Sequence, residues 1–252
     1  MKKLVYLLAL GLSISACEKD KKDDNPAASG TPAAPTISVP GMDGLLVALN
    51  SSSSVEVPFI GTTTTTLGLA IAKFYENQDP SKGVNAGTVS VDTENLKYTS
   101  GTYIYEMSAT NPTGLTFGST QGWQIAGNGS VPAISETHNR EVPVVADLTG
   151  LENGVDISGD FSFGINTSSL FSNISPADSI LYLIIDNAGG VVQKTMHKSQ
   201  TQVTFSKAEL SGLAKGNGYA QAAAYNTVIR DYSGYKIAYI NEGVNTKTVE
   251  IK

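Results

Sequence analysis

The chain is poor in the residues that build redox, metal and acid–base sites. Its 252 residues contain one cysteine, Cys17, and two histidines, His138 and His197. A single cysteine forms neither an intramolecular disulfide nor a thiolate zinc cluster. The histidines lack HExxH spacing, and no G-x-S-x-G motif is present. We therefore predict no metal ion, no cofactor and no enzymatic activity, and we interpret both histidines as surface residues.

Long apolar segments are also scarce. The apolar run Leu4–Leu12 is too short to cross about 30 Å of hydrocarbon, which takes roughly 20 helical residues. It follows Lys2 and Lys3 and precedes Ser13-Ile14-Ser15-Ala16, in which all but Ile14 are small, and this is the order of a secretory signal. We predict that residues 1–16 are a signal peptide that is removed after export.

The end of this segment, Ile14-Ser15-Ala16-Cys17, resembles a bacterial lipobox. In lipoproteins of that kind the cysteine sulfur takes a diacylglyceryl group before cleavage. The resemblance implies that Cys17 is lipidated and that the membrane is a partner through this anchor. Ordinary cleavage after Ala16 is the alternative, and it would leave an exposed thiol, which is a liability in an oxidising compartment.

Residues 17–35 are predicted to be the lipidated N-terminus and a flexible tether. The charged run Glu18–Asp24 is followed by a stretch rich in Ala, Pro, Ser and Gly, without apolar periodicity. The Lys and Asp cluster after Cys17 resembles the export signal of Bacteroidota surface lipoproteins. This resemblance implies a lipid-anchored outer-membrane protein that faces the cell exterior. The alternative location is the periplasmic face.

Acidic side chains outnumber basic ones. Removal of residues 1–16 takes away Lys2 and Lys3 and no acid, so 15 basic side chains remain against 23 acidic ones, a net charge of −8. An acidic protein repels nucleic acid and anionic surfaces. We therefore predict no nucleic-acid partner.

From residue 36 onward, short runs rich in Val, Ile, Thr and Tyr alternate with Gly, Pro, Asn, Asp and Ser. Residues 155–165 show the clearest period of two, with Val155, Phe163 and Ile165 on one face. No long amphipathic helix separates the runs, which predicts an all-β fold. The predicted strands are Leu45–Asn50, Val55–Ile60, Leu67–Asn77, Gly87–Val91, Tyr103–Ser108, Trp123–Gly127, Val142–Leu148, Val155–Ile165, Ile180–Asp186, Val191–His197, Gln202–Ser206, Tyr219–Val228 and Tyr235–Asn241.

The length of chain that follows the predicted tether fits two β-sandwiches of roughly 100 residues each, which predicts two tandem domains at residues 36–135 and 136–252. The polar stretch between Val131 and Arg140 marks the boundary. In the second domain Ser206 and Glu209 have the spacing of a helix-capping box, and Tyr219 opens the next strand. This strand, helical turn and tyrosine resemble the E to F corner of immunoglobulin-like and fibronectin-like sandwiches. That resemblance implies a tyrosine hydroxyl tied back to the turn.

Aromatic side chains are the candidates for ligand contact, because glycans and peptides both dock on rings with polar tips. Trp123, Tyr232 and Tyr235 are the possible contacts, although Trp123 also suits a core position. We expect Tyr232 at a loop tip and a hairpin turn at Asp186–Gly190. Two functions remain open: a binding or adhesion module for a glycan or protein, and a structural or accessory subunit of an outer-membrane complex. A hydrolase is a third alternative, which ranks behind both. A broad apolar patch would favour the second.

Overall fold

The computed structural model describes residues 39–252 except 58–60 and 170–171. The predicted signal peptide, Cys17 and the predicted tether lie outside the described residues, as does the end of the predicted strand 55–60. The described chain consists of β-strands and one short helix, α1 (Lys207–Leu210), which confirms the predicted all-β class. None of its helical residues form a segment long and apolar enough to span a membrane.

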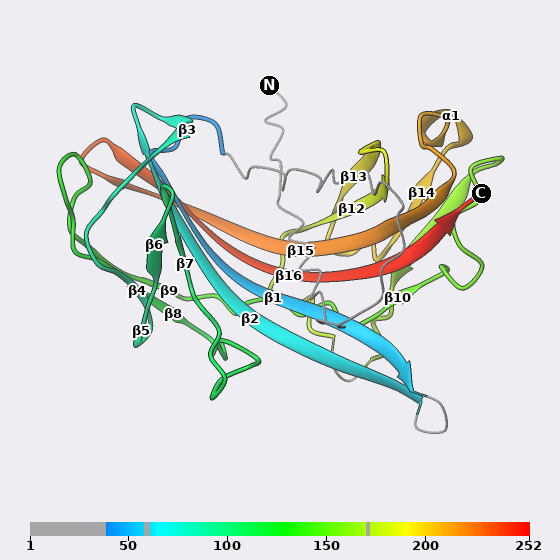
Figure 1. Ribbon diagram of the computed structural model, residues 1–252, viewed down its shortest axis with the longest axis horizontal. Helices are drawn as coiled ribbons and strands as arrows, with labels where there is room; N and C mark the ends of the chain where they lie inside the picture. Colours follow the sequence, from blue (N-terminus) through cyan, green and yellow to red (C-terminus); the bar gives the residue numbers. More distant parts are fainter. Residues whose placement is uncertain (1–38, 58–60, 170–171) are drawn as a thin grey trace, which may run out of the picture.

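One large sheet runs through the whole molecule. Its strand order is β13-β12-β15-β16-β1-β2-β7-β6, with β3 paired to β2. Figure 1 shows that the four longest strands, β1, β2, β15 and β16, lie side by side along the long axis. The strands are β1 (Gly44–Val57), β2 (Gly61–Glu76), β3 (Asp79–Val84), β6 (Lys97–Thr99), β7 (Thr102–Ile104), β12 (Ser179–Asp186), β13 (Val191–His197), β15 (Gly216–Tyr232) and β16 (Tyr235–Ile251).

Two small sheets lie at opposite ends of the large one (Figure 1). The first has the order β5-β4-β8-β9 and the second β10-β11-β14. Their strands are β4 (Val89–Val91), β5 (Glu94–Asn95), β8 (Gln121–Ile125), β9 (Ile134–His138), β10 (Leu148–Thr149), β11 (Phe161–Ile165) and β14 (Gln202–Phe205).

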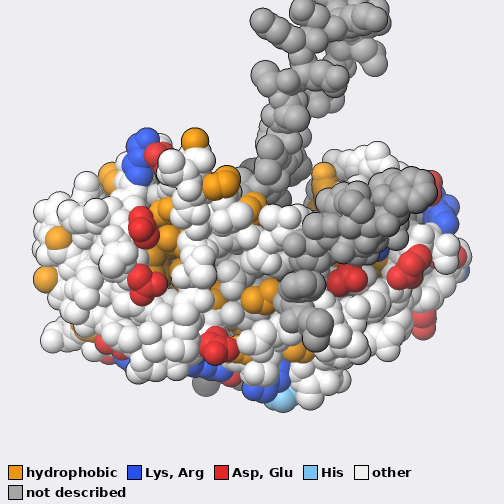
Figure 2. Space-filling model, turned by 90° about the horizontal axis from the view of Figure 1, so that it is seen from below, with side chains coloured by type: hydrophobic (Ala, Val, Ile, Leu, Met, Phe, Trp, Pro, Cys, Tyr) orange, Lys and Arg blue, Asp and Glu red, His pale blue; other side chains and the backbone are white. Residues whose placement is uncertain are grey.

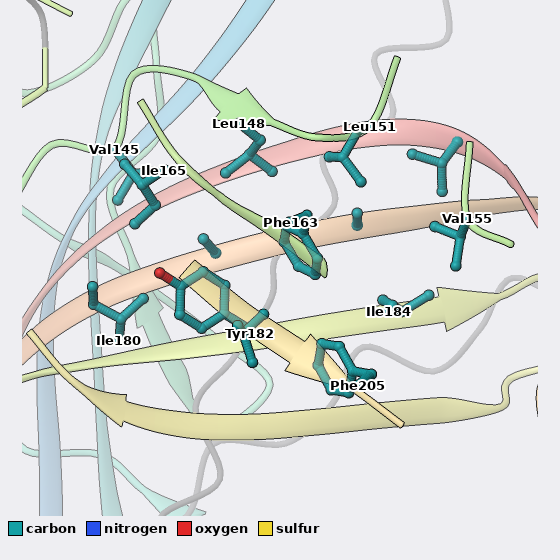
Figure 3. Packing of buried hydrophobic residues seen from close by; sticks show 14 of the residues in the cluster. Val145, Leu148, Leu151, Val155, Phe163, Ile165, Ile180, Tyr182, Ile184 and Phe205 are labelled. Carbon is teal, nitrogen blue, oxygen red and sulfur yellow. The ribbon is translucent and has the colours of Figure 1, made fainter. Parts of the chain in front are cut away.

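Each small sheet closes a hydrophobic core against the same face of the large sheet. Ile237 and Tyr239 of β16 belong to the first core, and Val249 and Ile251 belong to the second. All four are odd-numbered residues of one strand, and alternate residues of a strand point to the same side. Figure 3 shows the second core, where the ring of Phe163 is edge-on to Tyr182 (centroids 5.5 Å apart) and stacked on Phe205 (6.2 Å).

Strands from the two halves of the chain pair within the large sheet. Strand β1 belongs to the first predicted domain, yet it pairs in parallel with β16, from Gly44 opposite Ile237 to Ser52 opposite Asn245. The two cores still follow the two halves closely. Apart from Ile237 and Tyr239, the buried residues of the first core come from residues 46–142, and those of the second come from residues 145–251. Independent folding of residues 36–135 and 136–252 stays a prediction.

The segment between the small sheets is irregular where the sequence predicts the strand Val142–Leu148. It crosses the large sheet between the two cores, and side-chain amides of that sheet donate hydrogen bonds to its carbonyl groups. Asn241 Nδ2 donates to Arg140 O (2.7 Å), and Asn245 Nδ2 donates to Ala146 O (2.8 Å). Within the predicted strand, Val144 forms an isolated bridge with Asn173, and only Leu148, with Thr149 after it, joins a sheet.

The predicted strand Val155–Ile165 is shorter in the structure and begins at Phe161. The Asp156 carboxylate accepts a hydrogen bond from Ser158 N (2.8 Å), a local turn that competes with strand pairing. Val155 is nevertheless fully buried, and it forms a bridge with Ile251. The prediction of its burial was therefore correct, while that of its secondary structure was wrong.

The capping box at Ser206 is confirmed. Ser206 Oγ accepts from Glu209 N (3.4 Å), and Ser206 N donates to Glu209 Oε2 (2.7 Å), so α1 begins immediately after this residue. The tyrosine corner expected from the immunoglobulin-like resemblance is not formed. Tyr219 is 48% exposed, and it lies on the face of the large sheet opposite the two cores.

Candidate functional site: the apolar face of the large sheet

The side of the large sheet that points away from both small sheets is also hydrophobic, and we call it the apolar face. Leu45, Val47 and Leu49 of β1 lie on it and alternate with Leu46 and Ala48, which belong to the first core. The sheet is therefore apolar on both sides. The buried hydrophobic residues of the apolar face are Met42, Leu45, Val47, Leu49, Leu69, Tyr75, Leu181, Leu183, Ala223, Ala238, Ile240 and Val244.

The apolar face receives no second sheet from the described chain. Every hydrophobic residue of its cluster comes from β1, β2, β12, β15 or β16, or from the segment that leads into β1. The two cores on the other side, by contrast, include residues from the small sheets. Within residues 39–252, gaps excepted, this face is thus a single layer.

Exposed hydrophobic residues continue the apolar face at its margins. Six large hydrophobic side chains of the described chain are exposed, and the strand register places four of them on this face. Each of the four is paired with a residue that lines the face: Ile104 with Ile71, Val191 and Tyr219 with Ile185, and Ile229 with Ala238. We call these four the rim: Ile104 (41% exposed), Val191 (50%), Tyr219 (48%) and Ile229 (50%).

Three buried oxygen atoms on the apolar face have no hydrogen-bond partner: Gln221 Oε1, Thr227 Oγ1 and Glu242 Oε1. The register sets Gln221 opposite Leu183 and sets Thr227 opposite Ile240. An unsatisfied buried acceptor destabilises a fold by about 1–3 kcal/mol. The face therefore combines hydrophobic side chains with acceptors that can take hydrogen bonds from an occupant.

Glu242 is the only carboxylate among these three residues. It is 1% exposed, and it lies between Leu49 of β1 and Tyr225 of β15. Burial raises its pKa well above the ordinary range, because the ionised form is poorly solvated there. A cationic or other donor group placed against it would relieve this penalty.

Charged side chains on the side seen in Figure 2 are mostly acidic. They lie among patches of hydrophobic side chains, while the basic side chains visible in this view lie near the margins of the molecule. The surface on this side of the molecule is thus mostly neutral and acidic.

The three predicted contact residues all pack around the first core. Trp123 is 1% exposed within it, which matches the core alternative. Tyr232 and Tyr235 face each other across the β15–β16 hairpin, as expected for residues next to a turn. Their hydroxyl groups are engaged internally: Tyr232 with the Tyr239 hydroxyl (2.6 Å) and Tyr235 with Asp43 O (2.9 Å). Ligand contact at these two tyrosines stays a prediction.

The prediction that His138 lies on the surface was wrong. It ends β9 with 5% exposure, neither ring nitrogen has a hydrogen-bond partner, and its ring is edge-on to Tyr239 (6.2 Å). Burial lowers its pKa to about 4, and the charges of Arg140 and Arg230 add to this effect. His197 is exposed, as predicted, and its Nδ1 is 2.9 Å from Ser199 Oγ.

The predicted hairpin turn at Asp186–Gly190 is confirmed, and its carboxylate has a structural role. Asp186 accepts backbone hydrogen bonds from Ala214 (2.6 Å), Gly190 (2.7 Å) and Ala188 (2.8 Å). These donors, led by Ala214, lower the pKa of Asp186. No three His, Cys, Asp or Glu side chains of the described chain lie close enough together to hold a metal ion.

A cavity of about 290 Å³ beside the first small sheet is a weaker candidate. Its acidic residue Asp92 is already engaged, because Oδ1 accepts from Gly122 N (2.8 Å). The cavity has no hydrophobic anchor except Leu115. It is lined by Asp92, Thr93, Glu94, Asn111, Gly114, Leu115 and Thr116.

Comparison with protein-family models and with curated proteins finds no match. Among solved structures the chain is similar to one described as "Crystal structure of tetra-tandem repeat in extending region of large adhesion protein". The identity is 14% and the TM-score is 0.22. The match covers 81% of this chain and 50% of that structure, so this chain spans about half of that protein's length. The class defined by the fold itself is an all-β protein built on one long sheet with two cores.

Proposed function

We propose that this chain is a lipid-anchored, non-catalytic protein of the cell envelope that binds a protein partner through the apolar face. The rim carries the proposal: four half-exposed hydrophobic side chains surround a hydrophobic sheet face in an acidic protein. Extended apolar patches on soluble domains mark interaction sites. The lipobox-like sequence that ends at Cys17 supports the anchor.

A protein partner suits this surface better than a glycan does. Glycans dock on exposed aromatic rings with free polar tips. Trp123 is buried, the hydroxyl groups of Tyr232 and Tyr235 are engaged, and Tyr219 is the only aromatic residue of the rim. Three of the four exposed rim side chains are aliphatic, as is common at the centre of a protein interface, which favours an accessory subunit of an outer-membrane complex.

The anchor is tested by a Cys17→Ser variant. Without the thiol no lipid is attached, and a soluble acidic domain is expected to leave the membrane pellet almost completely after cell fractionation. Protease treatment of intact cells then distinguishes display on the cell exterior from the periplasmic face. If the Cys17→Ser chain stays in the pellet, the lipid anchor is wrong.

The docking surface is tested by Tyr219→Asp and Ile229→Asp. Both side chains are about half exposed, so a charge there disturbs binding more than folding. We expect at least a tenfold lower yield of the partner in affinity purification from the envelope, measured by quantitative mass spectrometry. The matched control is Met107→Asp, at an exposed hydrophobic residue outside the rim. Equal recovery of the partner by all variants would refute binding at this face.

A further inference from the structure

Strand β9 is the outer strand of the first small sheet, and its even-numbered residues attach it to the large sheet. Alternate residues of a strand point to the same side. Ile134 belongs to the first core. Glu136 Oε1 accepts a hydrogen bond from Arg230 Nε of β15 (3.0 Å). The ring of His138 is edge-on to Tyr239 of β16 (centroids 6.2 Å apart), so it makes the last of these contacts before β9 ends.

His138 also lies where the chain leaves the small sheet and begins to cross the large one, and we call residues 139–147 the crossing segment. Two residues after His138, Arg140 O accepts a hydrogen bond from Asn241 Nδ2 (2.7 Å). The same amide donates to Oε1 of Gln121 (2.8 Å), the residue of β8 that is paired with His138. The small sheet, the large sheet and the crossing segment therefore meet at this histidine.

The His138 ring is buried without a hydrogen-bond partner. It is 5% exposed, and both ring nitrogens are unpaired. A neutral imidazole has one donor and one acceptor nitrogen, whereas an imidazolium has two donors and a positive charge. Burial of an unpaired charge costs far more free energy than burial of an unpaired neutral group. A protonated ring is therefore not stable in this position.

The charged and titratable groups around the ring do not compensate a positive charge. Arg140 and Arg230 oppose it, and the carboxylate that favours it, Glu136, is already bonded to Arg230. The hydroxyl group of Tyr239 is engaged with that of Tyr232 (2.6 Å). Element by element, these groups are Glu136 of β9, Arg140 of the crossing segment, Arg230 and Tyr232 of β15 and Tyr239 of β16, while β8 contributes the neutral Gln121.

We infer that His138 is a pH-sensitive switch: when its ring takes up a proton, β9 and the start of the crossing segment detach from the large sheet while the second core stays closed. The ring reaches water by a short movement, because the next residue, Asn139, is already exposed. The movement ends farther along the chain, where Asn50 Nδ2 holds Pro143 O (3.3 Å). This goes beyond the proposed function, since the first core and the apolar face lie on opposite sides of the large sheet.

The closed form binds this proton more weakly than the open form. Burial, together with the charges of Arg140 and Arg230, lowers the pKa of His138 to about 4 in the folded chain, whereas a ring in water has the ordinary value of 6.5. Between pH 4 and 6.5 the open form is protonated and the closed form is not, so the equilibrium constant for opening rises as the pH falls. From pH 7 to pH 4.5 the expected increase is roughly 50-fold.

Native-state hydrogen exchange in low concentrations of urea tests the inference on the full mature chain with Cys17→Ser. Exchange rates are divided by the intrinsic rates at each pH, so that they report the opening equilibrium. We expect the amides of residues 134–138 to lose protection roughly 50-fold between pH 7 and pH 4.5. At both pH values their protection should be lower than that of β12 in the second core. It should hardly depend on urea, because a local opening exposes little surface, whereas the protection of β12 should fall steeply with urea.

Three variants separate the histidine from other effects of acid. His138→Gln keeps a polar side chain that does not titrate, and it should abolish the pH dependence at β9, as should His138→Leu. His197→Leu, at an exposed histidine, is the matched control and should behave like the parent. Equal protection and equal urea dependence of β9 and β12 in the parent at pH 4.5 would overturn the inference in favour of global unfolding. Protection of β9 that is independent of pH, or that falls as much in His138→Gln as in the parent, would also overturn it.

Discussion

A Gly243→Ala chain is expected to lose about 3 kcal/mol of unfolding free energy. Gly243 lies in β16, where the irregular segment crosses the large sheet between the two cores. A Cβ atom at this position would lie 2.2 Å from Pro143 O and 2.5 Å from Pro143 C. Both are backbone atoms, so no side-chain rotation relieves the clash. The crossing segment must move away from the sheet.

That movement would also strain the neighbouring hydrogen bonds. Asn241 and Asn245 flank Gly243 and hold the carbonyl groups of Arg140 and Ala146. The Asn245 amide would be left buried and unpaired, while Asn241 would keep only its bond to Gln121 Oε1 (2.8 Å), which adds to the loss. Urea denaturation followed by circular dichroism measures the effect. Gly159→Ala is the matched control, because nothing lies within 4 Å of its Cβ, and it should stay within about 0.5 kcal/mol of the parent. Equal stability of both variants would refute close packing at Gly243.

The second large effect is a loss of stability when the pH falls from 6.5 towards 4. His138 has a pKa of about 4 in the folded chain, against an ordinary value of 6.5. Between pH 4 and 6.5, His138 is protonated in the unfolded chain but not in the folded chain. The free energy of unfolding therefore rises with pH across this window. The whole effect is on the order of 3 kcal/mol, since one pKa unit corresponds to about 1.4 kcal/mol.

His138→Leu should remove this dependence, and His197→Leu, at an exposed position, should leave it intact. Denaturation at several pH values between 4 and 7 provides the measurement. The groups facing His138 are Tyr239, Arg140, Arg230 and Glu136. Glu242 acts in the opposite sense: its pKa is raised, so its contribution is full at low pH and is lost as the pH rises through that raised pKa. The difference between the parent and His138→Leu isolates the histidine. An NMR titration of His138 with a midpoint near 6.5 would contradict the prediction.

Local features of the fold could be predicted because they depend on neighbouring residues. The Ser206–Glu209 capping box and the Asp186–Gly190 turn are built from side chains that bond to nearby backbone. The strand Ile180–Asp186 is likewise evident from its hydrophobic β-forming residues. Strand prediction failed where side chains took over the hydrogen bonds of the backbone, as Asn241 and Asn245 do for the crossing segment.

The candidate site was only partly visible in the sequence. Residues 45–49 and 180–185 are continuous apolar runs, and such runs are typical of strands covered on both faces. That signal could have indicated a second hydrophobic side of the sheet. The exposure of Tyr219 and Ile229 could not be foreseen, because it depends on which parts of the apolar face are covered in the folded chain.

The sequence alone determined the all-β class and the position of most strands, while the export signal and the lipid anchor at Cys17 stay predictions. The class and the strand positions follow from composition and from periodicity within a few residues. Only the tertiary structure decided that β1 pairs with β16, that His138 is buried and that one sheet carries two cores and an apolar face. The alternation of hydrophobic and polar residues predicts which side of a strand is hydrophobic. It does not predict which strand, almost two hundred residues away, lies beside it.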